Sequence, residues 1–206
     1  MSLARKIPTT IAFLFFMTLL TGALYPALVT AIAQIAFPGR ANGSLVALKG
    51  KVAGSALLAQ KFESPRFFRP RPSASDFAYI GAGSSNLGPT SADLAKAVAD
   101  RRAAFAKAFG QAGGQASGLS PESAPEDMLY SSASGLDPDI SPDAALAQVD
   151  AVGAARRLDE EGKKALVGEI EGMAGASRSL LGPPRVNVVE LNLLLESDPR
   201  FADRGR

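Results

Sequence analysis

The 206-residue chain contains no cysteine and no histidine. The first absence excludes disulfide bonds and thiolate metal sites, and the second excludes imidazole ligands and every catalytic scheme that uses a histidine base. The sequence also contains no G-x-x-x-x-G-K-S/T loop, no G-x-S-x-G elbow and no Asp-Lys-Thr-Gly-Thr phosphorylation motif. These absences predict a chain with no catalytic residues of its own, no metal site and no firmly bound cofactor.

Charge is also absent over one long stretch, because residues 7–39 include no Asp, Glu, Lys or Arg. A hydrocarbon core about 30 Å thick needs roughly 20 apolar residues in a helix, so the stretch is long enough to span a bilayer. Arg5 and Lys6 precede it, and a single Arg40 follows it. By the positive-inside rule, this bias predicts a cytoplasmic N-terminus and an extracytoplasmic domain. One span cannot enclose a pore, which argues against a channel.

The uncharged stretch carries features that a lone anchor does not need. Pro26 removes a backbone hydrogen bond and tends to kink a helix, while Thr21 and Gly22 let another helix approach closely. We therefore predict that residues 1–40 form an anchor that packs against partner helices. The alternative is a signal peptide, cleaved near Ala31-Ile32-Ala33 to release a secreted binding domain. The stretch is about twice as long as the apolar centre of a signal peptide, which favours a retained anchor.

The remaining residues, 41–206, have the length of one domain. They hold 19 bases and 20 acids, so the positive net charge of the chain comes from the two ends of the anchor. That distribution gives no reason to expect a nucleic-acid partner.

The pattern of apolar and capping residues predicts mixed secondary structure in this domain. Two short apolar runs flank Lys49-Gly50-Lys51 and predict a β-hairpin over residues 45–59. Ser141-Pro142-Asp143 combines a serine cap, a proline in the first turn and an acid, which predicts the start of a helix. We expect helices over residues 90–109, capped by Thr90 or Ser91 and ended by Gly110, over 141–157 and over 159–174.

Two further segments complete the prediction. Residues 186–195 form either a strand that leads into a helix or a short helix, because apolar residues occupy both phases. Residues 111–125 form a flexible insert of low complexity. The predicted fold class is an α/β (α+β) soluble domain on a single N-terminal transmembrane helix.

Blocks of sequence spread over the chain match one known pattern. The most specific is Ser132–Pro138 (SASGLDP), and Phe68 with Arg71–Ala74 matches a Phe-x-x-Arg-Pro-Ser-Ala block. The other matching positions, in chain order, are Thr21-Gly22, Tyr25-Pro26, Phe37-Pro38, Ala41–Leu45, Gly54-Ser55, Leu58, Gln60, Phe62, Gly83–Pro89, Ile140-Ser141, Gln148-Val149, Arg156, Val186–Val188 and Leu191–Leu193. In these blocks the chain resembles the C subunit of the bacterial Kdp-type high-affinity potassium-transporting ATPase.

The likeness extends over nearly the whole chain, with two departures. Family members usually carry histidine where Asp139 stands, and Pro-Arg where Asp150 and Ala151 stand. Roles tied to those family side chains therefore do not transfer to this chain.

The resemblance implies a place in a four-component pump of the bacterial inner membrane. In it a channel-like subunit takes up potassium, a P-type subunit hydrolyses ATP and a small peptide subunit lies alongside. It implies a non-catalytic accessory subunit, needed for assembly and stabilisation of the pump and for shaping ion access, in contact with membrane lipid and not with nucleic acid. The alternative is a catalytic chaperone that binds nucleotide and raises the ATP affinity of the ATP-hydrolysing subunit, with ATP reached through the complex. That alternative requires a cytoplasmic domain, against the topology that the charges predict.

One candidate binding site is the loop over Gly81–Pro89. Consecutive backbone N–H groups in such a loop can bind a phosphate, and an amide side chain can bond an adenine edge. The candidate nucleotide contacts are Ser84, Ser85, Asn86 and Gln148. We favour the simpler interpretation, in which the loop is solvated and the amides of Gln60 and Gln148 bond backbone groups.

Two other clusters of side chains have alternative uses. Asp137 and Asp139 could bind a cation, but we favour a turn at Asp137-Pro138 followed by a helix cap at Ser141. Arginine alternating with phenylalanine over residues 66–71 is more typical of a protein interface than of nucleic-acid binding. The residues predicted to contact partner subunits are Tyr25, Pro26, Phe68 and Arg71.

Overall fold

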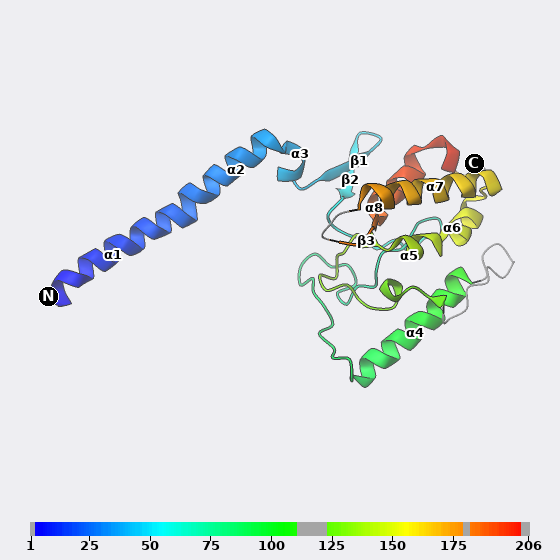
Figure 1. Cartoon of the computed structure of the whole chain (residues 1–206), viewed down its shortest axis with the longest axis horizontal. Helices are drawn as coiled ribbons and strands as arrows, with labels where there is room; N and C mark the ends of the chain where they lie inside the picture. The colour runs from blue at the N-terminus through cyan, green and yellow to red at the C-terminus, as the bar shows by residue number, and fades with distance from the viewer. Residues whose placement is uncertain (1–2, 111–122, 179–181, 203–206) are drawn as a thin grey trace. The chain divides into compact units, whose positions relative to one another are not determined.

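The computed structural model describes residues 3–110, 123–178 and 182–202 (Figure 1). Contacts within the chain divide it into two compact units, Met1–Leu45 and Val46–Arg206. The first unit consists of helix, and the second combines helices with two small sheets. The predicted class, an α+β domain on one N-terminal apolar helix, is confirmed.

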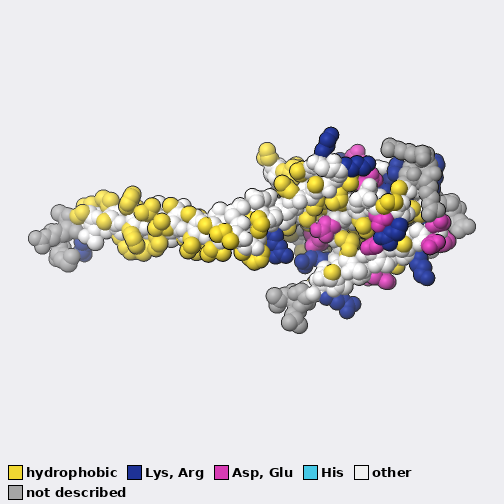
Figure 2. All heavy atoms as spheres, turned by 90° about the horizontal axis from the view of Figure 1, so that it is seen from above, with side chains coloured by type: hydrophobic (Ala, Val, Ile, Leu, Met, Phe, Trp, Pro, Cys, Tyr) yellow, Lys and Arg dark blue, Asp and Glu magenta, His cyan; other side chains and the backbone are white. Residues whose placement is uncertain are grey.

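The first unit contains one helix that is long and apolar enough to cross a membrane, over Lys6–Ala36. It comprises α1 (Leu3–Leu19), η1 (Leu20–Leu24) and α2 (Tyr25–Ala36), and the short α3 (Pro38–Ala41) follows. Its apolar side chains are exposed, with Phe15 and Leu14 at 70% and 65%. Figure 2 shows hydrophobic side chains along this helix, whereas charged side chains gather on the other unit. Such a surface is stable in lipid and not in water.

Where Pro26 was expected to kink the helix, the structure has one wider helical turn. At η1 the chain forms a π-helix, and the N–H of Tyr25 donates to the carbonyl of Leu20, five residues back. A proline ring clashes with the carbonyl four residues before it, which for Pro26 is that of Gly22. The extra residue in the turn moves this carbonyl aside, so the helix continues across the proline.

The second unit begins with the predicted hairpin, which the structure confirms. Strands β1 (Leu45–Leu48) and β2 (Lys51–Ser55) form a two-stranded sheet. Lys49 and Gly50 both have positive φ, at 51° and 77°. This conformation is that of a tight turn whose twist matches the twist of its strands.

The predicted helix over residues 90–109 is observed as α4 (Ala92–Phe109), with Ser91 rather than Thr90 as its cap. The helix predicted over residues 159–174 is α7 (Glu160–Ala176), capped by Asp159. Ser141 caps α5 (Pro142–Leu146), and its Oγ accepts from the N–H of Ala144 at 3.1 Å. Short helical turns occur at η4 (Glu126–Met128) and η5 (Pro199–Phe201).

Two parts of the prediction need correction or completion. The helix expected over residues 141–157 is divided into α5 and α6 (Val149–Arg156), with Ala147 and Gln148 between them. Residues 186–195 take the first of the two alternatives, as β4 (Val186–Asn187) leading into α8 (Val188–Ser197). Strand β4 pairs antiparallel with β3 (Asp139–Ile140), a pairing that the sequence did not predict.

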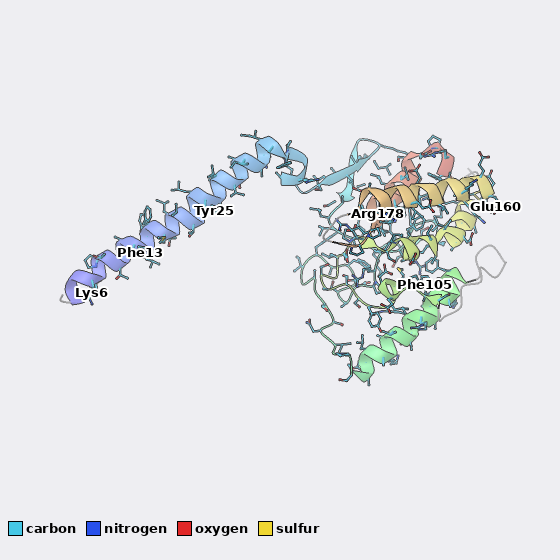
Figure 3. All side chains as sticks on the ribbon, viewed as in Figure 1. Lys6, Phe13, Tyr25, Phe105, Glu160 and Arg178 are labelled. Atoms are coloured by element: carbon cyan, nitrogen blue, oxygen red, sulfur yellow. The ribbon has the colours of Figure 1, made fainter. Side chains whose placement is uncertain are left out.

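Helices α4 to α8 enclose one hydrophobic core. Phe105 on α4 is 5% exposed and lies on the side of that helix that faces the rest of the unit (Figure 3). The core side chains without measurable exposure are Phe68, Ala144, Ala145, Val152, Leu166, Ile170, Val186, Val188, Leu191, Leu195 and Phe201. Most of the predicted flexible insert, residues 111–122, lies outside the described residues, and Ala124 at its end is buried.

Candidate functional site

A segment without helix or strand, residues 66–71, lies against α6 and α8, and three buried polar side chains hold its backbone. The carboxamide of Asn192 accepts from the N–H of Phe68 at 2.8 Å and donates to its carbonyl at 2.9 Å. The carboxamide of Gln148 accepts from the N–H of Arg69 at 2.8 Å and donates to its carbonyl at 3.2 Å. Each amide thus satisfies both backbone groups of one residue, as a neighbouring strand would.

The third holder is Arg156, which is 1% exposed. Its Nε donates to the carbonyl of Arg66 at 2.7 Å, and its Nη1 donates to the carbonyl of Leu195 at 2.8 Å. Its Nη2 forms an ion pair with Glu196 at 2.8 Å. A buried guanidinium needs such partners, because desolvation of an uncompensated charge is costly. Gln148, Arg156 and Asn192 together form a polar clasp that holds the backbone of residues 66–71.

This clasp accounts for two of the predicted site residues. Phe68 has no exposed surface and lies in the core, so the intact domain offers no Phe68 surface to a partner. Gln148 also has no exposure, and its carboxamide is bonded to the backbone of Arg69 and Ala144. Gln60 likewise donates to the carbonyl of Ala53 at 3.0 Å. The backbone role favoured for the two glutamines is observed, and a nucleotide role for Gln148 stays a prediction.

The other candidate nucleotide contacts, Ser84, Ser85 and Asn86, lie exposed on the loop before α4, whereas Gln148 is buried. The Oγ of Ser84 accepts from the N–H of Asn86 at 3.3 Å. The backbone of this loop approaches Gly135 closely at Gly83. A Cβ on Gly135 would lie 2.8 Å from the carbonyl oxygen of Gly83, so there is no room for a larger residue at position 135. Gly135 also has φ of 72°, a conformation that favours glycine.

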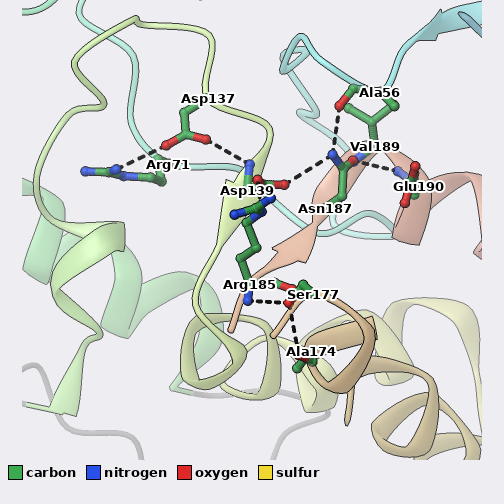
Figure 4. Close-up of polar contacts among 10 residues, drawn as sticks. All are labelled: Ala56, Arg71, Asp137, Asp139, Ala174, Ser177, Arg185, Asn187, Val189 and Glu190. Carbon is green, nitrogen blue, oxygen red and sulfur yellow. Dashed lines mark hydrogen bonds and ion pairs between the residues drawn. The ribbon is translucent and has the colours of Figure 1, made fainter. Parts of the chain in front are cut away.

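The acidic cluster around Asp137 and Asp139 forms the network of Figure 4. One Asp137 oxygen accepts from the N–H of Asp139 at 3.1 Å, which is the predicted turn, and the other pairs with Arg71 at 3.1 Å. Asp139 pairs with Arg185 at 2.9 Å and accepts from Asn187 at 3.2 Å. The cluster therefore joins the turn to β4, and its carboxylates face arginines and amides.

Asp139 is the carboxyl group in this network whose pKa departs from the ordinary value. Burial raises the pKa of Asp139, and the neighbouring Asp137 raises it further, while Arg185 and the hydrogen bond from Asn187 lower it. The ion pair and the burial therefore act in opposite directions. The net shift is upward because removal from water is the largest of these effects.

The predicted contacts in the anchor lie on the exposed surface of the apolar helix. Tyr25 is 63% exposed and points away from the helix axis (Figure 3). It ends the wide turn, and Pro26 follows it directly. Nothing lies within 4 Å of the position that a Cβ on Gly22 would occupy, so this surface is open to another helix.

These features define a class of protein, an α+β domain carried on one membrane-spanning helix. A family model for the c chain of the K+-transporting ATPase matches residues 7–197. Curated relatives named as the KdpC subunit of the potassium-transporting ATPase include proteins of Pseudomonas savastanoi (44% identity, covering 89% of this chain and 88% of the relative) and Bradyrhizobium diazoefficiens (41%, 93% and 96%). A third, from Kineococcus radiotolerans, is 43% identical and covers 95% of both chains. The chain belongs to the KdpC family of potassium-transporting ATPase subunits, and its apolar helix indicates a single-pass membrane protein.

Two residues of the clasp, Arg156 and Asn192, were not among the predicted site residues. Both positions lie in blocks that match the family. Asn192 lies on the buried side of α8, between the fully buried Leu191 and Leu195, whereas Glu190 of the same helix is exposed. A polar residue on the apolar face of a helix indicates a buried hydrogen bond, and this signal could have identified Asn192.

Proposed function

We propose that the chain is a non-catalytic accessory subunit that stabilises the assembled potassium pump. Its helix packs against membrane helices of the channel-like and ATP-hydrolysing subunits, and its domain lies on the extracytoplasmic side, where it shapes ion access. The observation that carries the proposal is the uncharged helix with an open surface at Gly22 and Thr21, beside the wide turn. Helices associate in membranes through such small-residue surfaces, because backbones can approach closely there.

The domain supports a binding role more than a chemical one. Three of its buried polar side chains, Gln148, Arg156 and Asn192, bond the backbone of the domain itself. Their hydrogen bonds fix the shape of the surface that a partner would meet. A pre-formed surface loses less conformational entropy when it binds.

The proposal is tested in the complete complex with three variants of this chain. Deletion of residues 1–40 and Gly22→Leu are expected to reduce co-purification of the ATP-hydrolysing subunit and the potassium-stimulated ATPase activity. Ala27→Leu, which also introduces a leucine at an exposed position but in α2, is the matched control and is expected to leave both unchanged. Full assembly and transport by the deletion variant would refute the docking role.

The nucleotide-binding alternative places the domain in the cytoplasm, where ATP is available. Protease added to oriented vesicles separates the two arrangements. Cleavage of the domain only from the extracytoplasmic face supports the accessory role as proposed. Cleavage only from the cytoplasmic face would refute our topology and favour the catalytic chaperone.

A further inference from the structure

A groove of about 420 Å³ lies between α4 and the segment that follows β2. Its walls are mostly aromatic or apolar. Three arginines also line it, of which Arg71 pairs with Asp137 at 3.1 Å and the other two, Arg69 and Arg101, come from different elements. The groove residues on which the following argument depends are Arg69, Phe77, Arg101, Phe105, Phe109 and Met128. The volume is that of a site for one or two side chains or a small ligand.

The two arginines carry positive charge without a carboxylate partner among the residues that the structure describes. The guanidinium of Arg69 lies over the ring of Phe109, 5.4 Å from its centroid. Arg101 donates to the carbonyl of Leu129 and to the Oγ of Ser131, both at 2.8 Å. Both side chains are half-buried, so these charges are less well hydrated than those of exposed lysines.

The remaining charged residues of the groove largely neutralise one another. Arg71 pairs with Asp137 at 3.1 Å. Lys61 at the rim pairs with Asp76 at 2.8 Å and with Glu63 at 3.4 Å. The positive charge available to a ligand is therefore that of Arg69 and Arg101.

We propose that this groove binds a segment of a partner subunit in which a carboxylate stands next to an apolar side chain. The proposal rests on the accessory-subunit function, and it assigns to the domain a contact separate from that of the membrane helix. The two guanidinium groups bind the carboxylate, and the rings of Phe77, Phe105 and Phe109 surround the apolar side chain. Arginine and aromatic residues together are enriched where protein interfaces gain most of their binding energy.

The rim argues for a protein ligand over an anionic bilayer. Glu63 and Asp76 have side chains that are 77% and 75% exposed. A broad anionic surface would approach both carboxylates and be repelled, and lipid surfaces are usually bound by clusters of unopposed lysine and arginine. A single acidic side chain can enter the groove between them.

The test is site-specific photo-crosslinking in the assembled complex. Ala104 lines the groove and is exposed, whereas Ala103 is exposed on the same helix and is not part of the groove. A benzophenone amino acid at position 104 is expected to crosslink to another subunit, at a peptide that contains Asp or Glu beside an apolar residue. The same group at position 103 is the matched control and is expected to give little of this product.

Charge variants test the role of the arginines. Arg69→Met and Arg101→Met are each expected to lower the crosslink yield from position 104 roughly tenfold, whereas Lys107→Met, at an exposed position of α4 outside the groove, leaves it unchanged. Thermal unfolding of each variant checks that the domain is folded. If Arg101→Met does not fold, the crosslink yield of Arg69→Met alone tests the role of the arginines. Crosslinks only to lipid, equal yields from both positions, or no effect of Arg69→Met would overturn the proposal. If the other subunits co-purify and position 104 gives no crosslink, the groove assignment alone fails; if they never co-purify, the accessory function fails.

Discussion

Replacement of Gln148 by leucine measures how much the polar clasp contributes to the stability of the domain. The substitution keeps a similar volume but leaves the N–H and carbonyl of Arg69 without their partner at 2.8 and 3.2 Å. A buried backbone group that loses its hydrogen bond costs about 1–3 kcal/mol, so two such groups cost about 2–6 kcal/mol. Each kcal/mol lowers Tm by about 2–4 °C in a chain of this size. We therefore expect Tm to fall by roughly 4–24 °C.

The assay is thermal unfolding of the full chain in detergent, monitored by circular dichroism. Gln60→Leu is the matched control, because Gln60 also donates to a backbone carbonyl, that of Ala53, but is partly exposed. Water can replace its bond, so the expected loss is less than about 1 kcal/mol. If Gln148→Leu lowers Tm no more than Gln60→Leu, the clasp is not a determinant of stability. If Gln148→Leu leaves Tm unchanged but abolishes an ATP-dependent property of the complex, Gln148 contributes to nucleotide binding.

Three further predictions, which involve five substitutions, follow from the same structure. Arg156→Met leaves several buried carbonyls and Glu196 unpaired and is expected to lower the free energy of unfolding by about 3–5 kcal/mol. Glu196→Gln changes a partly exposed partner and is expected to lower it by less than half as much. Chemical denaturation measures both. The raised pKa of Asp139 means that its contribution to stability is fully present below its unfolded pKa, about 3.9, and is lost as pH rises through the higher folded pKa. Asp139→Asn should therefore remove a decline in stability that begins as the pH rises above this unfolded pKa, and an unchanged pH profile in unfolding experiments would show that Arg185 offsets the burial. Gly135→Ala should destabilise by more than about 1 kcal/mol, since its Cβ would meet Gly83 and its φ is 72°. Gly172→Ala in α7, where nothing lies within 4 Å, should instead stabilise by about 0.5–1 kcal/mol, and a loss of stability there would contradict the reasoning.

The elements that the sequence predicted well are those with local causes. The Lys49-Gly50 turn specified the hairpin, and Ser141 specified the start of α5, because a turn or a cap depends on residues close together in the chain. The apolar helix was equally clear, since length and lack of charge are enough to indicate a membrane span. The wide turn at η1 also has a local cause, Pro26, but the sequence predicted only a tendency to kink there and not a π-helix.

The elements that the sequence did not predict depend on distant partners. The break between α5 and α6 places the carboxamide of Gln148 against Arg69, which lies 79 residues earlier. The two-residue pairing of β3 with β4 joins Asp139 to Asn187, and neither strand is long enough to show alternation. Phe68 was expected at a surface because of its arginine neighbours, but the clasp holds its backbone in the core. Such contacts are fixed by tertiary packing and not by sequence periodicity.

The clasp also has a consequence for how the protein is made. Asn192 bonds a residue that lies 124 positions earlier in the chain, and loops of that length close slowly. During synthesis the apolar N-terminal helix and residues 66–71 leave the ribosome long before residue 192. The central segment therefore lacks its Asn192 partner until translation is nearly complete, and a chaperone that shields residues 66–71 in that interval would protect the chain from aggregation.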